Sequence, residues 1–185
     1  MNMQISRRIP LLTLDYQAVY PPDYTSTYIK STNHYGLGFE PFLAVCPWLP
    51  YSGSRYENSW MTASGHVTNQ RFHIDLGSTL ILRRIAYNNS HHDGYNTNVG
   101  VKDFTLQGSN SASAFNNLNY ATDNDWTNLS TDISSMLQHT ETLDGEETKY
   151  INVNGAGAYR YYALKCANNW GSTQYMGIRK LLFYV

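Results

Sequence analysis

One alternating stretch constrains the fold of this chain more than any other feature. In residues 70–77, apolar and polar side chains alternate, and the segment ends in Gly77. The apolar members are Phe72, Ile74 and Leu76. A period of two places these three side chains on one face of a β-strand, with a turn at the glycine. Residues 80–87 form a second apolar run, so the two segments predict the start of an antiparallel sandwich with one buried face.

Short strand-like segments continue from this pair to the C-terminus. We expect further strands at residues 101–108, 150–153, 161–166 and 178–184. Polar loops rich in Gly, Asn and Ser separate them, and we interpret the one weak helical pattern, Ile133–Leu137, as a turn or loop. Strands without amphipathic helices between them predict an all-β, antiparallel β-sandwich or jelly roll.

The first 50 residues differ from the rest because they hold all six prolines. Proline lacks a backbone donor and fixes φ, so this part cannot supply many central strands. We therefore predict an irregular, Pro-rich N-terminal extension or arm at residues 1–50 and a β-sandwich domain at residues 51–185. Leu11–Leu14 and Tyr28–Ile29 are candidate edge strands or parts of an arm. An apolar cluster is expected to join the extension to the core: Phe39, Phe42, Leu43, Val45 and Trp48.

Composition and charge argue against several classes of protein. Charged residues make up 15% and the formal net charge is −1, whereas nucleic-acid-binding proteins concentrate Lys and Arg. No apolar run approaches the roughly 18–20 residues of a membrane span, and the run after Arg7–Arg8 is too short for a secretion signal. Cys46 and Cys166 are either a disulfide, if the compartment is oxidising, or two buried free thiols.

Motifs from about residue 55 to the C-terminus follow a recognisable order. They are Trp60 and Ala63, residues 70–77, Leu82, Ile85 and Tyr87, residues 101–109, Trp126, residues 159–162 and residues 177–184. In this order they resemble the discoidin domain, also called the coagulation factor five/eight type C domain, one of the galactose-binding-like jelly rolls. The resemblance implies an eight-stranded antiparallel jelly roll whose loops at one end bind ligands. In the family these are most often terminal sugars such as galactose or fucose, and in some members lipids or proteins.

Two departures from the family pattern bear on its ligands. Lys180 stands where many members have a Glu that helps to hold a structural Ca²⁺, and an ammonium group cannot bind a cation. We therefore expect no cofactor, with structural calcium in doubt. Ala163 replaces an arginine that some members use as a polar group. The resemblance gives Asp75 a structural role.

Polar loops at residues 88–98 and 167–175, joined by residues 53–58, are the candidate binding site. Sugar recognition needs an aromatic platform, for which Trp170 and Tyr95 are candidates, and fixed donors and acceptors for hydroxyl groups. The candidates for hydrogen bonding are Arg55, His91, His92, Asp93, Asn168 and Asn169. The competing explanation is that turns favour Asn, Gly and Asp for conformational reasons.

Metal binding and catalysis have weaker support in the sequence. His91, His92 and Asp93 are adjacent and lack a ligand at a metal-site spacing, so we expect no metal there. His73 is expected at the surface or an edge of its strand, and Trp60 and Trp126 in core or corner packing. No nucleophile elbow occurs, and the carboxylates lie in polar loops, so we do not expect an enzyme.

The function that these observations favour is a non-catalytic carbohydrate-binding or cell-surface adhesion module, with a cell-surface glycan or glycoprotein as its partner. The alternative is a structural subunit of a larger assembly, such as a virion or tail component, with residues 1–50 as the assembly arm or a homo-oligomer contact. Lipid binding is a third possibility, for which only Trp170 and Tyr95 are suitable loop-tip side chains. An extracellular or virion-surface location fits both leading readings.

Overall fold

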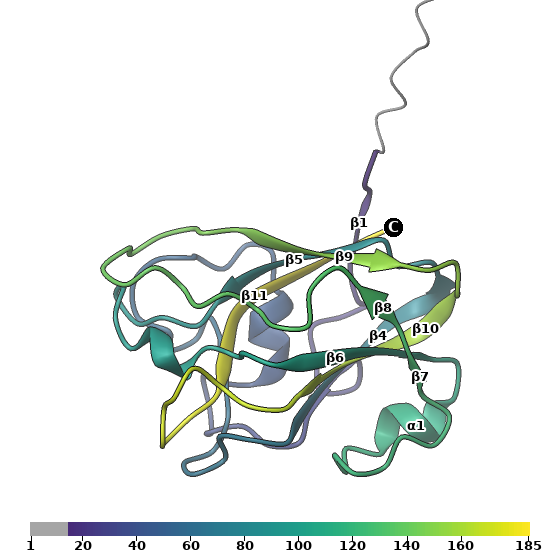
Figure 1. Cartoon of the computed structure of the whole chain (residues 1–185), viewed down its shortest axis with the longest axis horizontal. Coiled ribbons are helices and arrows are strands. Elements are labelled where there is room, and N and C mark those ends of the chain that lie inside the picture. Colours follow the sequence, from purple (N-terminus) through teal and green to yellow (C-terminus); the bar gives the residue numbers. More distant parts are fainter. Residues whose placement is uncertain (1–14) are drawn as a thin grey trace, which may run out of the picture.

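The computed structural model describes residues 15–185 and contains two antiparallel sheets that pack face to face (Figure 1). The six-stranded sheet consists of β1 (Ala18–Val19), β3 (Trp60–Met61), β5 (Arg84–Asn89), β8 (Ser130–Thr131), β9 (Lys149–Asn154) and β11 (Gly177–Tyr184). The five-stranded sheet consists of β2 (Ile29–Ser31), β4 (Gln70–Leu80), β6 (Phe104–Ser109), β7 (Thr127–Asn128) and β10 (Tyr159–Cys166). The predicted antiparallel β-sandwich is confirmed. It has more than eight strands because short segments pair at the edges of the sheets.

Helices are few and short in residues 15–185. They are the 3-10 helices η1 (Pro41–Val45) and η2 (Thr97–Val99) and the α-helix α1 (Ala112–Asn116). None of these helices is long and apolar enough to cross a membrane. Residues 133–137 form a loop, as predicted, whereas α1 lies inside residues 109–125, where we expected only a polar connection.

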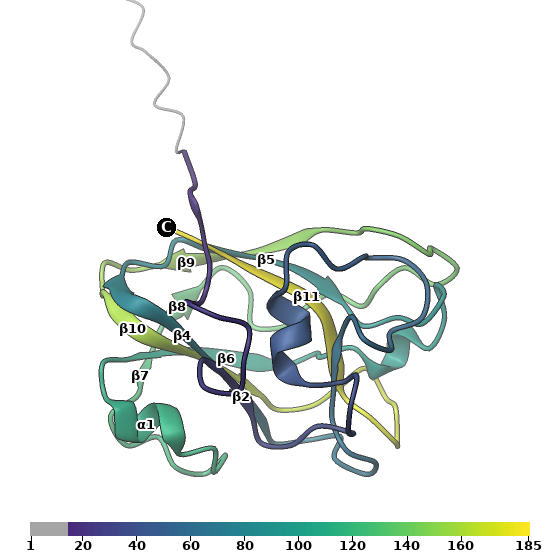
Figure 2. The same cartoon turned by 180° about the vertical axis from the view of Figure 1, so that it is seen from behind.

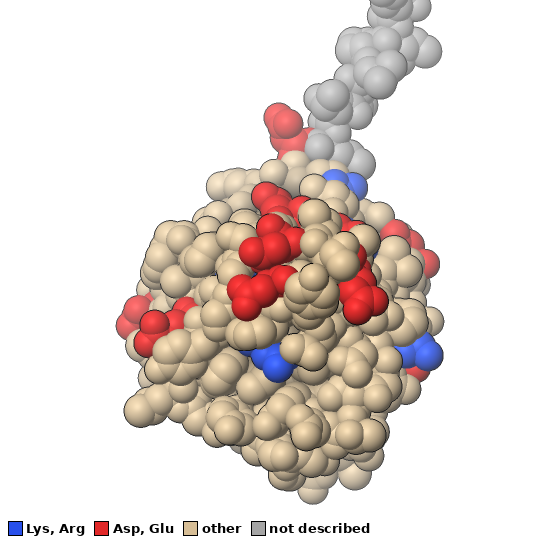
Figure 3. Space-filling view, turned by 90° about the vertical axis from the view of Figure 1, so that its left-hand side faces the viewer, with Lys and Arg blue, Asp and Glu red and all other residues tan. Residues whose placement is uncertain are grey.

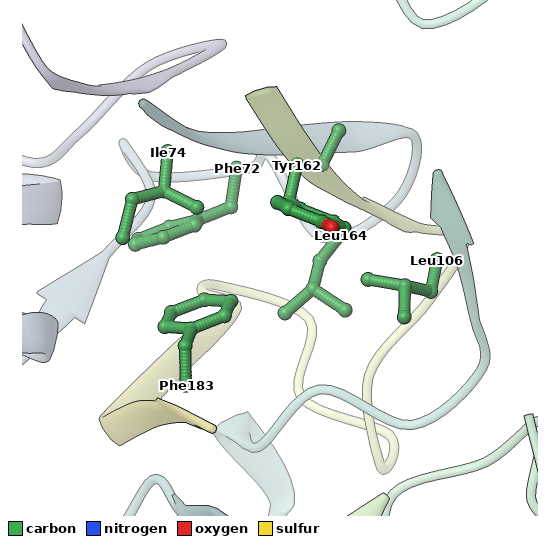
Figure 4. Close-up of a pocket in the computed structure, with 7 residues that line it drawn as sticks. Phe72, Ile74, Leu106, Tyr162, Leu164 and Phe183 are labelled. Atoms are coloured by element: carbon green, nitrogen blue, oxygen red, sulfur yellow. The ribbon is translucent and has the colours of Figure 1, made fainter. Parts of the chain in front are cut away.

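The core between the two sheets is filled with side chains. Figure 4 shows Phe72 and Ile74 of β4, Tyr162 and Leu164 of β10 and Leu106 of β6 on one side, with Phe183 of β11 facing them. All six are at most 3% exposed, and the space left between them is too small for a water molecule. A ligand must therefore bind outside the sandwich interior.

Both faces of β4 are buried over residues 70–76. The prediction that only the apolar face is buried is therefore wrong. Arg71 and His73 are fully buried, and Asp75 is nearly so. The connection after β6 folds back over this face: the Phe115 carbonyl lies 2.9 Å from His73 Nδ1, and Asp123 pairs with Arg71. The prediction that His73 lies at the surface or an edge is therefore wrong. Sequence alternation gives the two faces of a strand but does not reveal what covers the second face.

The N-terminal segment belongs to the sandwich in residues 15–50. β1 pairs with β11 and β2 pairs with β4, so the prediction of an edge strand at Tyr28–Ile29 is confirmed. Figure 2 shows this segment crossing the sandwich from β1 to β2, with η1 packed beside β11. Three of its side chains enter the core: Ile29, Ala44 and Val45. Trp48, predicted to join this cluster, is 67% exposed, and Leu11–Leu14 lies outside the described residues.

Candidate functional site

Four loops meet at the left-hand end of the sandwich in Figure 1. They are residues 51–58, 91–99, 138–147 and 171–175. Backbone hydrogen bonds hold them together: the Asp93 amide donates to the Gly53 carbonyl at 3.1 Å, and the Thr142 amide donates to the Gly94 carbonyl at 2.7 Å. The Ser172 amide reaches the Asn98 carbonyl at 3.3 Å. The predicted convergence of three loops is thus confirmed, and residues 138–147 form a fourth.

Two buried cations of β11 lie below this end of the sandwich: Arg179 bonds to the loops, and Lys180 bonds to the segment that precedes them. The Arg179 guanidinium donates to the carbonyls of Ser52, Gly53 and His91, and the Lys180 ammonium donates to the carbonyl of Cys46. Burial lowers the pKa of Arg179 to about 10 and that of Lys180 to about 8. A buried charge is tolerated only where polar groups surround it, so these carbonyls and cations depend on one another.

A first hollow of about 320 Å³ opens between three of the loops, and we call it the Arg55 hollow. Its lining is mostly polar and consists of Arg55, Asn96, Asn98, Val99, Gly171, Ser172, Thr173, Gln174 and Tyr175. Arg55 Nη1 is enclosed and has no hydrogen-bond partner among residues 15–185. Burial holds the pKa of Arg55 below its ordinary value, and the nearby Tyr175 opposes that shift. The rest of this partly exposed side chain lines the hollow, where its remaining N–H groups can donate to a polar ligand.

Tyr175 is the aromatic side chain of the Arg55 hollow. It is partly exposed, and its ring meets the Tyr35 ring edge-on with centroids 5.5 Å apart. An aromatic ring held in this way can pack against the apolar face of a sugar, while its hydroxyl group remains free to hydrogen bond. From the sequence, we expected Trp170 or Tyr95 to be this aromatic platform.

A second hollow of about 290 Å³ shares Asn96 and Asn98 with the first, and we call it the Glu141 hollow. It is lined by Asn96, Thr97, Asn98, Gln138 and Glu141. Gln138 Nε2 donates to Thr97 Oγ1 at 2.8 Å, which fixes the wall on that side. Glu141 is exposed and makes no hydrogen bond within the described residues.

His91 lies inside the protein, which corrects its assignment as a ligand-binding residue. Its Nε2 donates to the Tyr51 carbonyl at 2.8 Å, and its Nδ1 accepts from the Gly94 amide at 3.2 Å. The ring stacks on the His139 ring with centroids 4.0 Å apart. With both nitrogens occupied and no exposure, His91 organises the loops instead of contacting a ligand.

The polar side-chain atoms of Asn168, Asn169 and Trp170 also hydrogen bond within the protein. The amide of Asn169 binds the carbonyls of Ser172 and Tyr175 and accepts from the Gly171 amide. Asn168 is bound to Asp103 through its side chain at 2.8 Å. The indole of Trp170 donates to the Met136 carbonyl, and none of the three lines either hollow. Their bonds match the competing explanation, that turn geometry selects such residues.

His92, Asp93 and Tyr95 are at the surface beside the Arg55 hollow without lining it. His92 Nδ1 accepts from the Arg55 amide at 3.3 Å, and its Nε2 lies 3.4 Å from the Asp93 carboxylate. Tyr95 is 55% exposed. Arg55 is thus the one predicted ligand-binding residue that lines either hollow.

Seven residues that line the Arg55 hollow lie in the predicted loops but were not among the predicted binding residues: Asn96, Asn98, Gly171, Ser172, Thr173, Gln174 and Tyr175. The signal that could have found them is a run of small polar residues beside a tyrosine, which turns also produce.

Charge at this end of the molecule is mostly negative. Figure 3 views the end directly and shows acidic side chains gathered on its upper part, with few Lys or Arg. The exposed acidic residues of these loops are Glu57, Asp93, Glu141, Asp144 and Glu146. Within residues 15–185, no group of three or more His, Cys, Asp or Glu side chains is placed to hold a metal ion.

The two sheets have the galactose-binding-like, discoidin-type jelly-roll fold that the sequence resembles. The chain belongs to the DUF5000 family, a domain of unknown function whose sequence model matches residues 51–185. Among curated proteins, none matches this sequence.

Solved structures of similar fold come from bacterial carbohydrate-binding modules. A mutant of chitosan-binding module 1 from a Paenibacillus sp. IK-5 chitosanase/glucanase is 20% identical, with a TM-score of 0.55, covering 85% of this chain and 92% of that one. A Clostridium perfringens family 32 module in complex with GalNAc-β-1,3-galactose is 12% identical, with a TM-score of 0.57 and coverage of 85% and 94%. The C. perfringens NanJ module, in complex with galactose, is 12% identical, with a TM-score of 0.56 and coverage of 85% and 92%. At these identities the likeness establishes the fold alone.

Proposed function

We propose that this protein is a non-catalytic carbohydrate-binding module and that the Arg55 hollow is its sugar site. The observation that carries the proposal is the partly exposed Arg55 guanidinium, which makes no hydrogen bond within residues 15–185 and lines a polar hollow that also contains the Tyr175 ring. A sugar offers hydroxyl oxygens to the guanidinium and an apolar ring face to the tyrosine. Similarly folded modules are described as binding chitotriose, galactose and GalNAc-β-1,3-galactose, which supports the same class of ligand here.

The partner that we propose is a glycan or glycoprotein at a cell surface, with adhesion as the consequence. His92, Asp93 and Tyr95 remain candidates for contacts at the rim of the hollow. We also propose that binding needs no calcium. The buried ammonium of Lys180 donates to the Cys46 carbonyl, so this position is already occupied by a cation that belongs to the chain.

The first prediction tests the Arg55 hollow with an array of galactose-, fucose- and glucosamine-terminated glycans, probed with and without calcium. We expect binding to a subset of these glycans, and at least a tenfold loss of affinity for them in Arg55→Gln, because a hydrogen bond from a charged group contributes about 1.5–3 kcal/mol. Calcium is expected to change neither result.

Arg83→Gln is the matched control, because Arg83 is an exposed arginine whose side chain binds the Gly155 carbonyl and lines neither hollow. Equal binding by the wild type and Arg55→Gln would place the sugar elsewhere. A blank array with folded, multivalent protein would remove the carbohydrate proposal itself.

A further inference from the structure

The two hollows share one wall. Asn96 and Asn98 line both of them, and the buried Thr97 between them anchors this wall to Gln138. Asn96 has a left-handed backbone, with φ of 53° and ψ of 37°, which turns the chain sharply at this point. The two hollows therefore adjoin at residues 96–98, and we call this shared wall the ridge.

The ridge carries side chains that are free to bind. Asn96 and Asn98 are both exposed, and neither side-chain amide makes a hydrogen bond within residues 15–185. Each amide has a carbonyl acceptor and two N–H donors, which together match the hydroxyl groups of a sugar. Two adjacent free amides on one ridge can contact two successive units of a chain that crosses it.

Each hollow alone is small. Volumes of about 320 Å³ and 290 Å³ lie at the lower end of the roughly 300–1,000 Å³ that small-molecule sites occupy. Their polar groups differ, since the first offers the guanidinium donors of Arg55 and the second the carboxylate acceptors of Glu141. Arg55 lines only the first hollow and Glu141 only the second, so a ligand that contacts both must extend across the shared wall.

We propose that the two hollows are adjacent subsites for an oligosaccharide that crosses the ridge at residues 96–98, with one sugar unit at Arg55 and the next at Glu141. This inference rests on the carbohydrate-binding function proposed above and changes its ligand from a single terminal sugar to a chain of at least two units. Glu141 accepts a hydrogen bond from a hydroxyl or an amino group, so neutral and amino-sugar chains share the required chemistry.

Calorimetric titration of the intact chain with paired ligands tests this inference. The probes are galactose against GalNAc-β-1,3-galactose, and glucosamine against its β-1,4-linked disaccharide and trisaccharide. We expect a disaccharide to bind at least about tenfold more tightly than its monosaccharide, since one or two added hydrogen bonds are worth a factor of that order. Glu141→Ala should abolish this gain, whereas Arg55→Gln should weaken the binding of mono- and disaccharide alike.

Glu57→Gln is the control for net charge, because Glu57 is an exposed acidic residue of the same end that lines neither hollow. Equal affinities for mono- and disaccharides, or a gain that survives Glu141→Ala, would overturn the two-subsite inference and leave the Arg55 site intact. Loss of monosaccharide binding in Glu141→Ala would also overturn it, because the two hollows would then act as one site. Absence of binding to any probe, together with a blank array, would instead count against the carbohydrate function.

Discussion

At the residue scale, two histidines are held in their neutral form, mainly by burial. His73 Nε2 faces an N–H group of Arg71 at 3.3 Å, so it must accept, and its Nδ1 donates to the Phe115 carbonyl. His91 likewise accepts from the Gly94 amide on one nitrogen and donates on the other. Protonation would turn each acceptor into a donor that faces another donor. Burial is the main cause that lowers the pKa of both rings to about 4.

Neighbouring charges act on the same two rings. Arg71 and Lys30 further lower the pKa of His73, and His139 and Arg179 further lower that of His91, while Asp144 opposes the shift of His91. The unfolded chain binds these two protons near pH 6.5 and the folded chain only near pH 4. Stability is therefore complete above about pH 6.5 and falls as the pH decreases toward 4.

We predict a lower free energy of unfolding at about pH 5 than at about pH 7. Each histidine accounts for roughly 2 kcal/mol of the difference, at about 1.4 kcal/mol per pH unit. Urea unfolding at the two pH values measures it, and in His73→Gln the difference should shrink by about half. Equal free energies at both values would show that the rings are not held neutral.

At the element scale, β4 contains a bulge at Gly77, where the sequence predicted that the strand would end. Gly77 has φ of +77°, and the strand continues beyond it to Leu80. On one side of the bulge, the Asp75 carboxylate accepts a hydrogen bond from the Gly77 amide. It also accepts hydrogen bonds from Nε and Nη2 of Arg160, at 2.9 and 2.8 Å. This bonding is consistent with the structural role that the family resemblance gives Asp75. The motif is thus a strand with a built-in bend.

We predict that Gly77→Ala destabilises the protein by about 2 kcal/mol. A Cβ there would lie 2.6 Å from Pro22 Cγ, and the left-handed backbone costs an L-residue roughly 1–2 kcal/mol. Gly145→Ala is the matched control, because its Cβ would meet no atom within 4 Å and its φ is not positive. Chemical denaturation of both variants measures this loss of stability. An unchanged denaturation midpoint in Gly77→Ala would contradict the assignment of a strained bulge.

At the scale of the whole molecule, residues 15–50 complete the sandwich, although the family match begins at residue 51. Their removal would expose the outer edge of β4 at Ile74, which pairs with Ile29. It would also remove Ile29 and Val45 from the core and leave the Lys180 ammonium without the Cys46 carbonyl. Full burial of one such aliphatic side chain contributes about 1.5–3 kcal/mol, a large share of a typical stability of 5–15 kcal/mol.

We therefore predict that residues 51–185 alone do not fold stably, whereas residues 15–185 do. Circular dichroism and thermal melting of the two truncated chains provide the measurement. A cooperative melt of residues 51–185 near that of the full chain would restore the view of residues 1–50 as a separable arm. An assembly role for residues 1–50 remains a prediction. Comparing the sedimentation of the full chain with that of residues 15–185 would test this role for the first 14 residues.

The local order of the chain determined the fold class. Alternation in residues 70–77, short strands between Gly- and Asn-rich loops and the absence of amphipathic helices are properties of neighbouring residues, so they can be read without a structure. The same holds for the loops that form the site, because loops at one end of a sandwich follow from strand order. Cys46 and Cys166 are buried free thiols, one of the two states that their spacing allowed.

Only the tertiary structure decided which side chains within those loops face a ligand. His91 and Trp170 look like binding residues in the sequence, but carbonyls from distant segments, those of Tyr51 and Met136, occupy their polar atoms. Arg55 faces a hollow because residues 96–99 and 171–175 meet around it, and His73 is buried because residues 109–126 fold over β4. Exposure and hydrogen-bond pairing depend on contacts between residues far apart in the chain, and no local pattern encodes them.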